Sequence, residues 1–344
     1  MNSRVRQRFR DATLDDVAAR CGVSYQTVSR VANGSPLVAK ETRARILEAI
    51  AELNYRPNLA ARRLATRRSN VIGMMGTRVT YSGPAKVMIA IEESAKRRGY
   101  NLMFAAIERL TDSELGKAIG ALREHQVAGL VLAARLKGKI DLIRRLCRGV
   151  PFVTLGAGVA PDVPSVVVDE KHGVRAATRH LLDLGHHRIA CIAGPPGWPA
   201  SKDRRHACAQ TIRSAGFEPG PCVVGDWSAE SGYKAAVQLL ESASGRFTAI
   251  MAGNDHMALG ALRALHANGI PVPGRVSVVG YDNLPESGFF EPPLTTVHHD
   301  FAWEGESCVE MLFRAIDRES VEAPFRQVQR PQLVIRSSTA APGS

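Results

Sequence analysis

Apolar residues near the start of the chain recur with a helical period in two short stretches. Four of them share the first face at i, i+3, i+4 and i+7: Leu14, Val17, Ala18 and Cys21. Val28 and Val31 repeat the spacing after Gly22, a residue that readily ends a helix. The pattern predicts two helices separated by one tight turn, a helix-turn-helix.

Polar residues that suit helix starts precede both stretches. Thr13 can accept a hydrogen bond from the free amide of Asp16, and the acidic pair Asp15 and Asp16 suits the positive end of the helix dipole. Ser24 offers a second N-cap, and Val23 between the helices is expected in their core.

The second helix carries a polar face opposite its valines. This exposed face holds Tyr25, Gln26, Ser29 and Arg30. A helix of this kind fits the major groove of DNA, where Gln pairs with adenine and Arg with guanine. The alternative is an ordinary solvated surface helix.

A third helix is predicted over residues 39–54, with one apolar face made of Ile46, Leu47, Ile50 and Leu53. Its start is poorly capped, because Ala39 stands where Ser or Thr is preferred. Pro57 ends any continuation, and residues 58–65 can form one more short helix that is too small to be stable alone.

The pattern changes at residue 71 to short apolar runs alternating with amphipathic stretches. Strands are predicted in two series: 71–75, 100–106, 129–133 and 151–155, then 188–193, 222–224, 248–252 and 275–280. Strand and helix in alternation indicate parallel sheets covered on both faces. About 270 residues exceed one comfortable core, so two half-domains are expected.

Polar side chains follow several of these strands, where ligands collect in open parallel sheets. Asn254 and Asp282 come directly after apolar runs, and Arg205 and Trp227 could join them against a sugar ring. Each also has a purely structural interpretation: Asp282 as a turn former, Asn254 as the cap of the helix at Asp255, Trp227 as a rim residue, and Arg205 in a surface ion pair.

Positive charge is concentrated near the start. The chain has a formal net charge of +12, and its first 70 residues hold 14 basic and 6 acidic side chains. This density of positive charge favours contacts with the phosphates of nucleic acid and predicts that the affinity for DNA falls steeply as the salt concentration rises. Arg4, Arg6, Arg8 and Arg10 form a basic arm that either touches the DNA backbone or stays in water.

The chain resembles the LacI/GalR family of bacterial repressors. The resemblance rests on residues 23–31 (VSYQTVSRV), 52–58 (ELNYRPN), 61–65 (ARRLA), 181–190 (LLDLGHHRIA), 254–261 (NDHMALGA), 278–283 (VVGYDN) and 293–297 (PLTTV), and spans about residues 13–336. It implies an N-terminal all-α helix-turn-helix head and an α/β periplasmic-binding-protein-like core of two parallel-sheet subdomains. The expected divisions are 1–57 for the head with its arm, 58–70 for a hinge helix and linker, and 71–344 for the effector-binding and dimerisation core. Within the core, one subdomain takes about 71–168 with 301–326, and the other 169–297 with 328–336.

The resemblance also implies residue roles. The DNA-contacting residues would be Tyr25, Gln26, Thr27, Ser29, Arg30, Asn33, Asn58, Ala61 and Leu64, with Leu64 wedged into the minor groove at the centre of the site. The effector-binding residues would be Arg205, Trp227, Asn254 and Asp282, joined by Ser201 and Thr77. Gly156 and Val168 depart from the family pattern, which leaves the exact sugar open.

Enzymatic, metal and cofactor signals are missing from the sequence. It has no Walker-type phosphate loop and no GxGxxG after a strand, its six cysteines form no CxxC pair, and its His-His pairs lack metal-ligand spacing. No secretory segment or apolar run of membrane length appears, so a reduced cytoplasmic protein without membrane contact is expected. The alternatives from other classes are a transport-type sugar-binding protein and an enzyme that acts on sugars.

We therefore expect a transcriptional repressor that binds a pseudo-palindromic operator in double-stranded DNA as a homodimer. A small sugar-like effector in the cleft would change its DNA affinity, most simply as an inducer. A corepressor-responsive or activating regulator is the alternative. The tail after Ile335 carries no leucine heptads, which argues for a dimer and against a tetramer.

Overall fold

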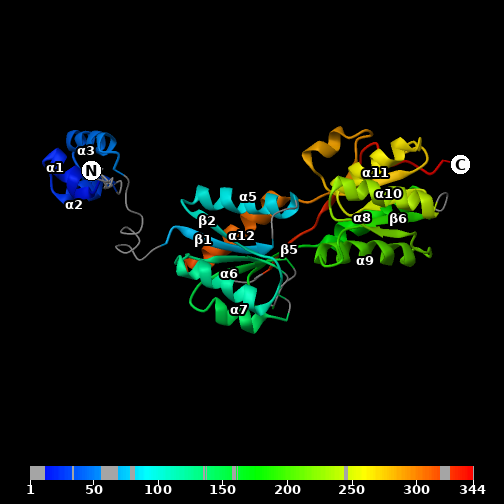
Figure 1. The fold of residues 1–344 in the computed structure, drawn as a ribbon, viewed down its shortest axis with the longest axis horizontal. Coiled ribbons are helices and arrows are strands. Elements are labelled where there is room, and N and C mark those ends of the chain that lie inside the picture. Colours follow the sequence, from blue (N-terminus) through cyan, green and yellow to red (C-terminus); the bar gives the residue numbers. More distant parts are fainter. Residues whose placement is uncertain are drawn as a thin grey trace, which may run out of the picture. The chain divides into compact units, whose positions relative to one another are not determined.

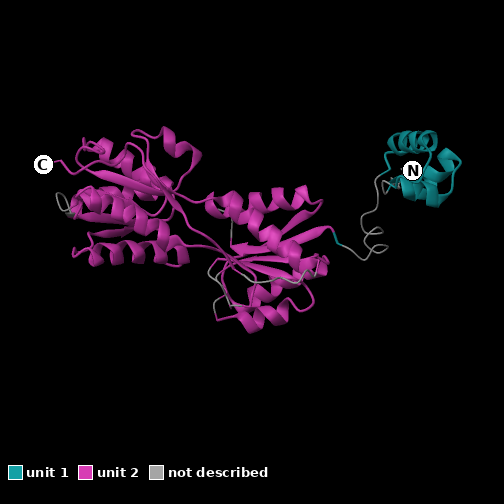
Figure 2. Cartoon of the chain, turned by 180° about the vertical axis from the view of Figure 1, so that it is seen from behind, with its two compact units in different colours: residues 1–69 teal, residues 70–344 magenta. Residues whose placement is uncertain are grey.

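The computed structural model describes residues 12–32, 35–55, 69–77, 82–134, 136, 138–156, 160, 162–243, 247–317 and 326–343. The chain divides into two compact units, residues 1–69 and residues 70–344 (Figure 2). Expectations for the basic arm and for Asn33, Asn58, Ala61 and Leu64 lie outside the described residues.

The first unit contains the predicted helix-turn-helix and its third helix. These are α1 (Leu14–Cys21), α2 (Tyr25–Ala32) and α3 (Lys40–Glu52). A small core joins them, in which Val17, Val28 and Ile46 are fully buried. Arg20 of α1 and Glu52 of α3 form an exposed ion pair at 2.8 Å.

The predicted caps are confirmed. The Thr13 hydroxyl accepts from the amide of Asp16 at 3.3 Å, while the Asp16 carboxylate accepts from the amide of Thr13 at 2.7 Å. Gly22 ends α1 at φ +64°, a left-handed conformation that suits a residue without Cβ. Ser24 accepts from the amide of Thr27 at 3.3 Å, and Ala39 makes no side-chain cap at the start of α3.

One core prediction for α3 is wrong. Leu47 is 51% exposed, because the helix buries the face of Ile46 and Ala49 and turns Leu47 away from it.

The second unit contains two six-stranded sheets, each covered by helices on both faces (Figure 1). We call the half built on the first sheet lobe 1 and the half built on the second sheet lobe 2. The strand order is β11-β5-β4-β3-β1-β2 in lobe 1 and β12-β10-β9-β8-β6-β7 in lobe 2. All pairings are parallel except that of β10 with β12.

Lobe 1 consists of β1 (Val71–Thr77), α5 (Ser82–Arg97), β2 (Asn101–Ile107), α6 (Asp112–Glu124), β3 (Leu130–Ala133), α7 (Ile140–Leu146), β4 (Phe152–Leu155), β5 (Ser165–Val168), α12 (Phe301–Ile316) and β11 (Arg326–Gln329). Helices α5 and α12 pack together over one core cluster, and α6 and α7 cover the other.

Lobe 2 consists of α8 (Glu170–Asp183), β6 (Ile189–Ala193), α9 (Pro199–Ser214), β7 (Cys222–Val224), α10 (Ala229–Ala243), β8 (Ala249–Ala252), α11 (Asp255–Ala267), β9 (Ser277–Asp282), η1 (Pro285–Phe289), β10 (Thr295–His298) and β12 (Gln332–Val334). Helices α8 and α9 pack on one face of its sheet, and α10 and α11 on the other.

The eight predicted strands are all present, and four further strands were not predicted. These are β5, β10, β11 and β12, each of three or four residues. They are too short for alternation to stand out, and β11 (RQVQ) reads as polar because it is a half-exposed edge strand.

The chain crosses between the lobes three times, after β5, after β10 and after β11. The last crossing follows Gln329, three residues later than the expected boundary at 326, because β11 pairs with β5 along its whole length. Gln329 contacts both of the other crossings. Its side-chain amide donates to the Asp300 carbonyl at 2.8 Å and accepts from the Asp300 amide at 3.2 Å, and its backbone carbonyl accepts from the amide of Asp169 at 2.9 Å.

Candidate functional site

The exposed face of α2 presents the side chains that the sequence placed there. Tyr25 is 50% exposed, and Gln26 and Arg30 are exposed as well, whereas Val28 and Val31 are buried against α1 and α3. Thr27 and Ser29 are half-buried, and the Thr27 hydroxyl lies 2.9 Å from that of Ser24 at the N-cap. The three exposed side chains are long polar or aromatic groups, free of the helix core, at the first and last turns of a short rigid helix.

The second unit contains a large cleft between its lobes, with a volume of about 790 Å³. Lobe 1 contributes Thr77, Phe104, Gly156 and Phe301, and lobe 2 contributes Trp227, Asn254 and Asp282. A cleft of this size suits a small ligand such as a mono- or disaccharide. The cleft lies at the carboxyl ends of β1 and β9, as expected for parallel sheets.

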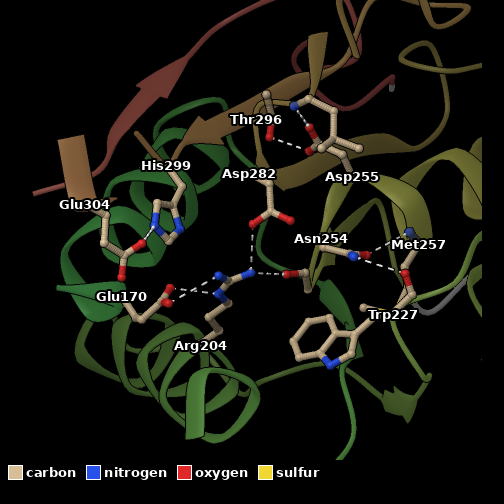
Figure 3. A network of polar contacts seen from close by, with 12 residues as sticks. Glu170, Arg204, Trp227, Asn254, Asp255, Met257, Asp282, Thr296, His299 and Glu304 are labelled. Atoms are coloured by element: carbon tan, nitrogen blue, oxygen red, sulfur yellow. Dashed lines mark hydrogen bonds and ion pairs between the residues drawn. The ribbon is translucent and has the colours of Figure 1, made fainter. Parts of the chain in front are cut away.

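Arg204 of α9 is the centre of the polar network in this cleft (Figure 3). Its guanidinium donates to the Glu170 carboxylate at 2.8 and 3.3 Å, to the Gly253 carbonyl at 2.7 Å and to Asp282 at 3.5 Å. Burial raises the pKa of Glu170, but the Arg204 charge more than offsets this effect and leaves the pKa below its ordinary value. Arg204 and Glu170 therefore form a buried, charged pair.

Asp282 is held in a strained conformation at the end of β9. Its φ is +105°, which residues with a Cβ rarely adopt, and its side chain is 7% exposed. Burial raises its pKa, and the Arg204 guanidinium reverses this only in part because the contact is long. A buried carboxylate with one weak partner retains acceptor capacity for a ligand.

A second acid and base pair lies at the lobe 1 wall of the cleft. His299, at the second crossing, is 2.7 Å from the Glu304 carboxylate of α12, and both are buried. Burial lowers the pKa of His299, but the Glu304 carboxylate raises it by more than this, so the pKa lies above its ordinary value. The ring of Phe301 stacks on His299 with centroids 4.0 Å apart.

Asn254 and Trp227 line the cleft and also have structural roles. Asn254 caps α11 by accepting from the amide of Met257 at 2.9 Å, and it donates to the Trp227 carbonyl at 3.0 Å. The capping alternative for Asn254 is thus confirmed as one of its roles. The indole of Trp227 packs edge-on against Trp198, and Gly194 leaves it room, since a Cβ there would lie 2.3 Å from the ring.

Two predicted effector residues do not face the cleft. Arg205 is exposed on α9, because the buried face of this helix carries Arg204 instead. Ser201 is buried below the cleft and donates to the Gly194 carbonyl at 2.6 Å. Thr77, Trp227, Asn254 and Asp282 do line it.

Sequence reasoning missed Arg204, Glu170, His299 and Glu304. The helical phase could have found Arg204, since the residues buried with it are spaced by three or four along α9: Ser201, Ala207, Cys208, Thr211 and Ile212. No comparable signal marks the other three, because Glu170, His299 and Glu304 come together only through the crossings between the lobes.

No group of three or more His, Cys, Asp or Glu side chains in the described ranges is arranged to hold a metal ion. None of the helices that the structure describes is long and apolar enough to cross a membrane.

Comparison with known proteins matches both units. Residues 13–58 match the family model "Bacterial regulatory proteins, lacI family", and residues 178–339 match "Periplasmic binding protein-like domain". The chain is 33% identical over 337 residues to the lactose operon repressor of Escherichia coli (strain K12), covering 98% of this chain and 93% of the relative. It is 34% identical over 334 residues to the repressor PurR of Pasteurella multocida (strain Pm70), covering 95% and 98%.

Solved structures agree. A crystal structure of the lac repressor dimer bound to operator and the anti-inducer ONPF matches with a TM-score of 0.85 and 34% identity, covering 96% of this chain and 100% of that one. A complex of the transcriptional regulator CelR with cellobiose matches with a TM-score of 0.68 and 33% identity, covering 95% and 99%.

Proposed function

Because this chain belongs to the lacI family of bacterial regulatory proteins, we propose that it is a transcriptional repressor that binds operator DNA and whose DNA affinity a small sugar-like effector controls. The observation that carries the proposal is that the similarity runs through both units, so the chain holds a DNA-reading head and a ligand cleft together. It acts by binding rather than by catalysis.

The head supports DNA recognition through the exposed face of α2. Tyr25, Gln26 and Arg30 point away from the core on a helix narrow enough for the major groove. Gln26 reads adenine and Arg30 reads guanine in this proposal, while Thr27, Ser29, Asn33 and Asn58 contact the backbone. Ala61 and Leu64 belong to a hinge that inserts into the minor groove.

The cleft supports a hydroxyl-rich effector more than an anionic one. Among the described residues, its lining includes five acidic side chains, Glu108, Glu170, Asp203, Asp282 and Glu304, against the guanidinium of Arg204 and the imidazole of His299. A phosphate or carboxylate would meet repulsion there, whereas hydroxyl groups can donate to Asp282 and accept from Arg204. Trp227, Phe104 and Phe301 supply apolar surface for the face of a sugar ring.

Control of DNA binding follows from the two lobes. A ligand that contacts both lobes favours the arrangement in which its contacts are complete, and DNA affinity changes by the same differential preference. We propose induction, in which the ligand lowers operator affinity, and a homodimer that reads two half-sites. The alternative is a corepressor-responsive or activating regulator of the same family.

Selection from a random DNA pool tests the proposal directly. Full-length protein is used to enrich duplexes with and without neutral sugars, sugar phosphates and purines, and the enriched site is then titrated by fluorescence anisotropy. The expected result is a pseudo-palindromic site whose affinity falls with a neutral sugar. Enrichment of no sequence refutes the DNA assignment, and an operator affinity that every sugar leaves unchanged refutes the effector assignment.

A further inference from the structure

Two cysteines stand opposite each other on neighbouring strands of lobe 2. Cys191 of β6 and Cys222 of β7 are paired in register in the parallel sheet, so their side chains project from the same face. That face lies under α8 and α9, since its other members pack there with Ala207 and Cys208 of α9. Paired Cα atoms on neighbouring strands are about 5 Å apart, which falls within the range that a disulfide spans.

The two thiols differ in access. Cys222 is exposed on a three-residue edge strand, while Cys191 is half-buried one strand further in. The other described cysteines are buried, namely Cys147, Cys208 and Cys308, or lie in the head as Cys21. Cys222 is therefore the cysteine of the second unit that a small reagent reaches first.

The surroundings of Cys222 favour its thiolate. The neighbouring Cys191 side chain lowers the pKa of Cys222 most, and the positive charge of Arg205 lowers it further. Together these effects outweigh the partial burial of the Cys222 sulfur and lower the pKa of Cys222 to about 7. The Cys222 side chain and burial raise the pKa of Cys191. Cys208 lies behind the pair on α9, and burial raises its pKa to about 11.

Arg205, which does not face the cleft, lies instead beside Cys222. As an exposed cation beside Cys222, it supplies the positive environment that characterises reactive cysteines. No third ligand completes a metal site here among the described residues, so metal binding does not account for the pair.

We propose that Cys222 is a peroxide-reactive thiol and that Cys191 is its resolving partner, so that oxidation links β6 to β7 by a disulfide. The Cys222 thiolate attacks one oxygen of hydrogen peroxide and becomes a sulfenic acid, while hydroxide leaves and takes up a proton as water. The Cys191 thiol then attacks the sulfenic sulfur, the S–S bond forms, and a second water leaves. Two thiols are oxidised and one peroxide is reduced, so the step balances without a cofactor.

The edge position makes the closure feasible. β7 pairs with β6 alone and is only three residues long, so it can approach β6 by the fraction of an ångström that a disulfide needs. Strands β6 and β7 end shortly before Gly194 and Trp227, and Arg205, the cation beside Cys222, follows Arg204 in α9.

Peroxide treatment of the full-length protein followed by non-reducing peptide mapping tests the linkage. The expected product is a peptide pair joined through Cys191 and Cys222, absent after reduction. In Cys191→Ser, Cys222 should instead give a sulfenic acid that dimedone traps. Cys21→Ser is the matched control, since it removes the partly buried thiol of the head and should leave the linkage unchanged.

The pH dependence of alkylation tests the role of Arg205. Iodoacetamide should label Cys222 with an inflection near pH 7, where about half of the thiol is ionised, against about 3% for an ordinary cysteine of pKa about 8.5. After correction for the weaker nucleophilicity of a more acidic thiol, labelling at neutral pH is about threefold faster than that of an ordinary cysteine. Arg205→Gln should move the inflection upward.

Three results would overturn the proposal. They are a Cys222 inflection near 8.5, a peroxide product at other cysteines, and a Cys222 link only between two protein molecules. Circular dichroism of each variant separates these results from misfolding, since the serine substitutions are nearly isosteric and Arg205 is exposed.

Discussion

Replacing Arg204 with methionine should destabilise the second unit strongly at neutral pH. The guanidinium satisfies Glu170 twice, the Gly253 carbonyl once and Asp282 weakly, and all of these groups are removed from most of the solvent. Methionine keeps part of the packing against the Tyr281 ring, whose centroid is 3.5 Å from the guanidinium carbon, but it leaves two carboxylates without a cation.

The expected penalty follows from the cost of a broken buried pair. Removing one partner of such a pair costs about 3–5 kcal/mol, and the unpaired carbonyl is part of that loss. A value near 4 kcal/mol lowers the folding equilibrium constant about a thousandfold. Arg205→Met, one position along the same helix but exposed, should cost less than about 0.5 kcal/mol and is the matched control.

The pH dependence of the penalty identifies its cause. In the parent, Arg204 holds the pKa of Glu170 below its ordinary value, so this carboxylate adds stability above its unfolded pKa and loses it as the pH falls. In Arg204→Met, burial is unopposed, and the pKa values of Glu170 and Asp282 both lie above their unfolded values. Protonation then favours the folded variant, so the penalty should shrink between about pH 7 and about pH 5.

Urea unfolding followed by far-UV circular dichroism at both pH values measures this difference. The double variant Glu170→Gln with Arg204→Met should regain part of the loss, because one buried charge is removed with its partner. A penalty below about 1 kcal/mol, or one that grows as the pH falls, would refute the view of Arg204 as the neutralising cation of the cleft.

Three further predictions concern other parts of the chain. Thr13→Ala should lower the stability of the head by about 1 kcal/mol in calorimetry, because it removes the hydroxyl that accepts from the amide of Asp16 and donates to the Asp16 carboxylate, whereas Thr13→Ser should not. Gln26→Ala should relax the preference at one base position by about 1–3 kcal/mol in competition binding, and an unchanged preferred site would remove Gln26 as a reader. Burial raises the pKa of Asp255 to about 7, so the parent should lose stability as the pH rises from about 4 to 7, and Asp255→Asn should flatten that part of the profile.

Local patterns predicted the elements that local forces decide. The cap at Thr13, the left-handed Gly22 and the valines of α2 depend on neighbours a few residues away, and each was predicted and is present. The long strands of both series followed from their apolar runs. The sequence did not predict the short edge strand β11, because half of its residues face solvent and its partner β5 is about 160 residues away in the chain.

The candidate site shows the same limit. Asn254, Asp282 and Thr77 could be placed because they lie at or just after the carboxyl ends of strands. On α9, the choice of Arg205 ignored the helical phase that turns Arg204 inward. The pairs of Glu170 with Arg204 and of His299 with Glu304 depend on segments that approach only where the chain passes between the lobes. Hydrophobic periodicity carries no information about such tertiary proximity.

The interleaved path of the chain bears on how this protein is made. The core of lobe 1 contains Cys308, Val309, Met311 and Leu312, which leave the ribosome after nearly all of lobe 2. Until α12 and β11 emerge, the nascent chain carries an open sheet edge at β5 and an uncovered apolar face beside β3 and β4. Lobe 1 therefore completes its folding late in translation, and truncated products that end before residue 301 retain a sticky surface that favours aggregation or capture by chaperones.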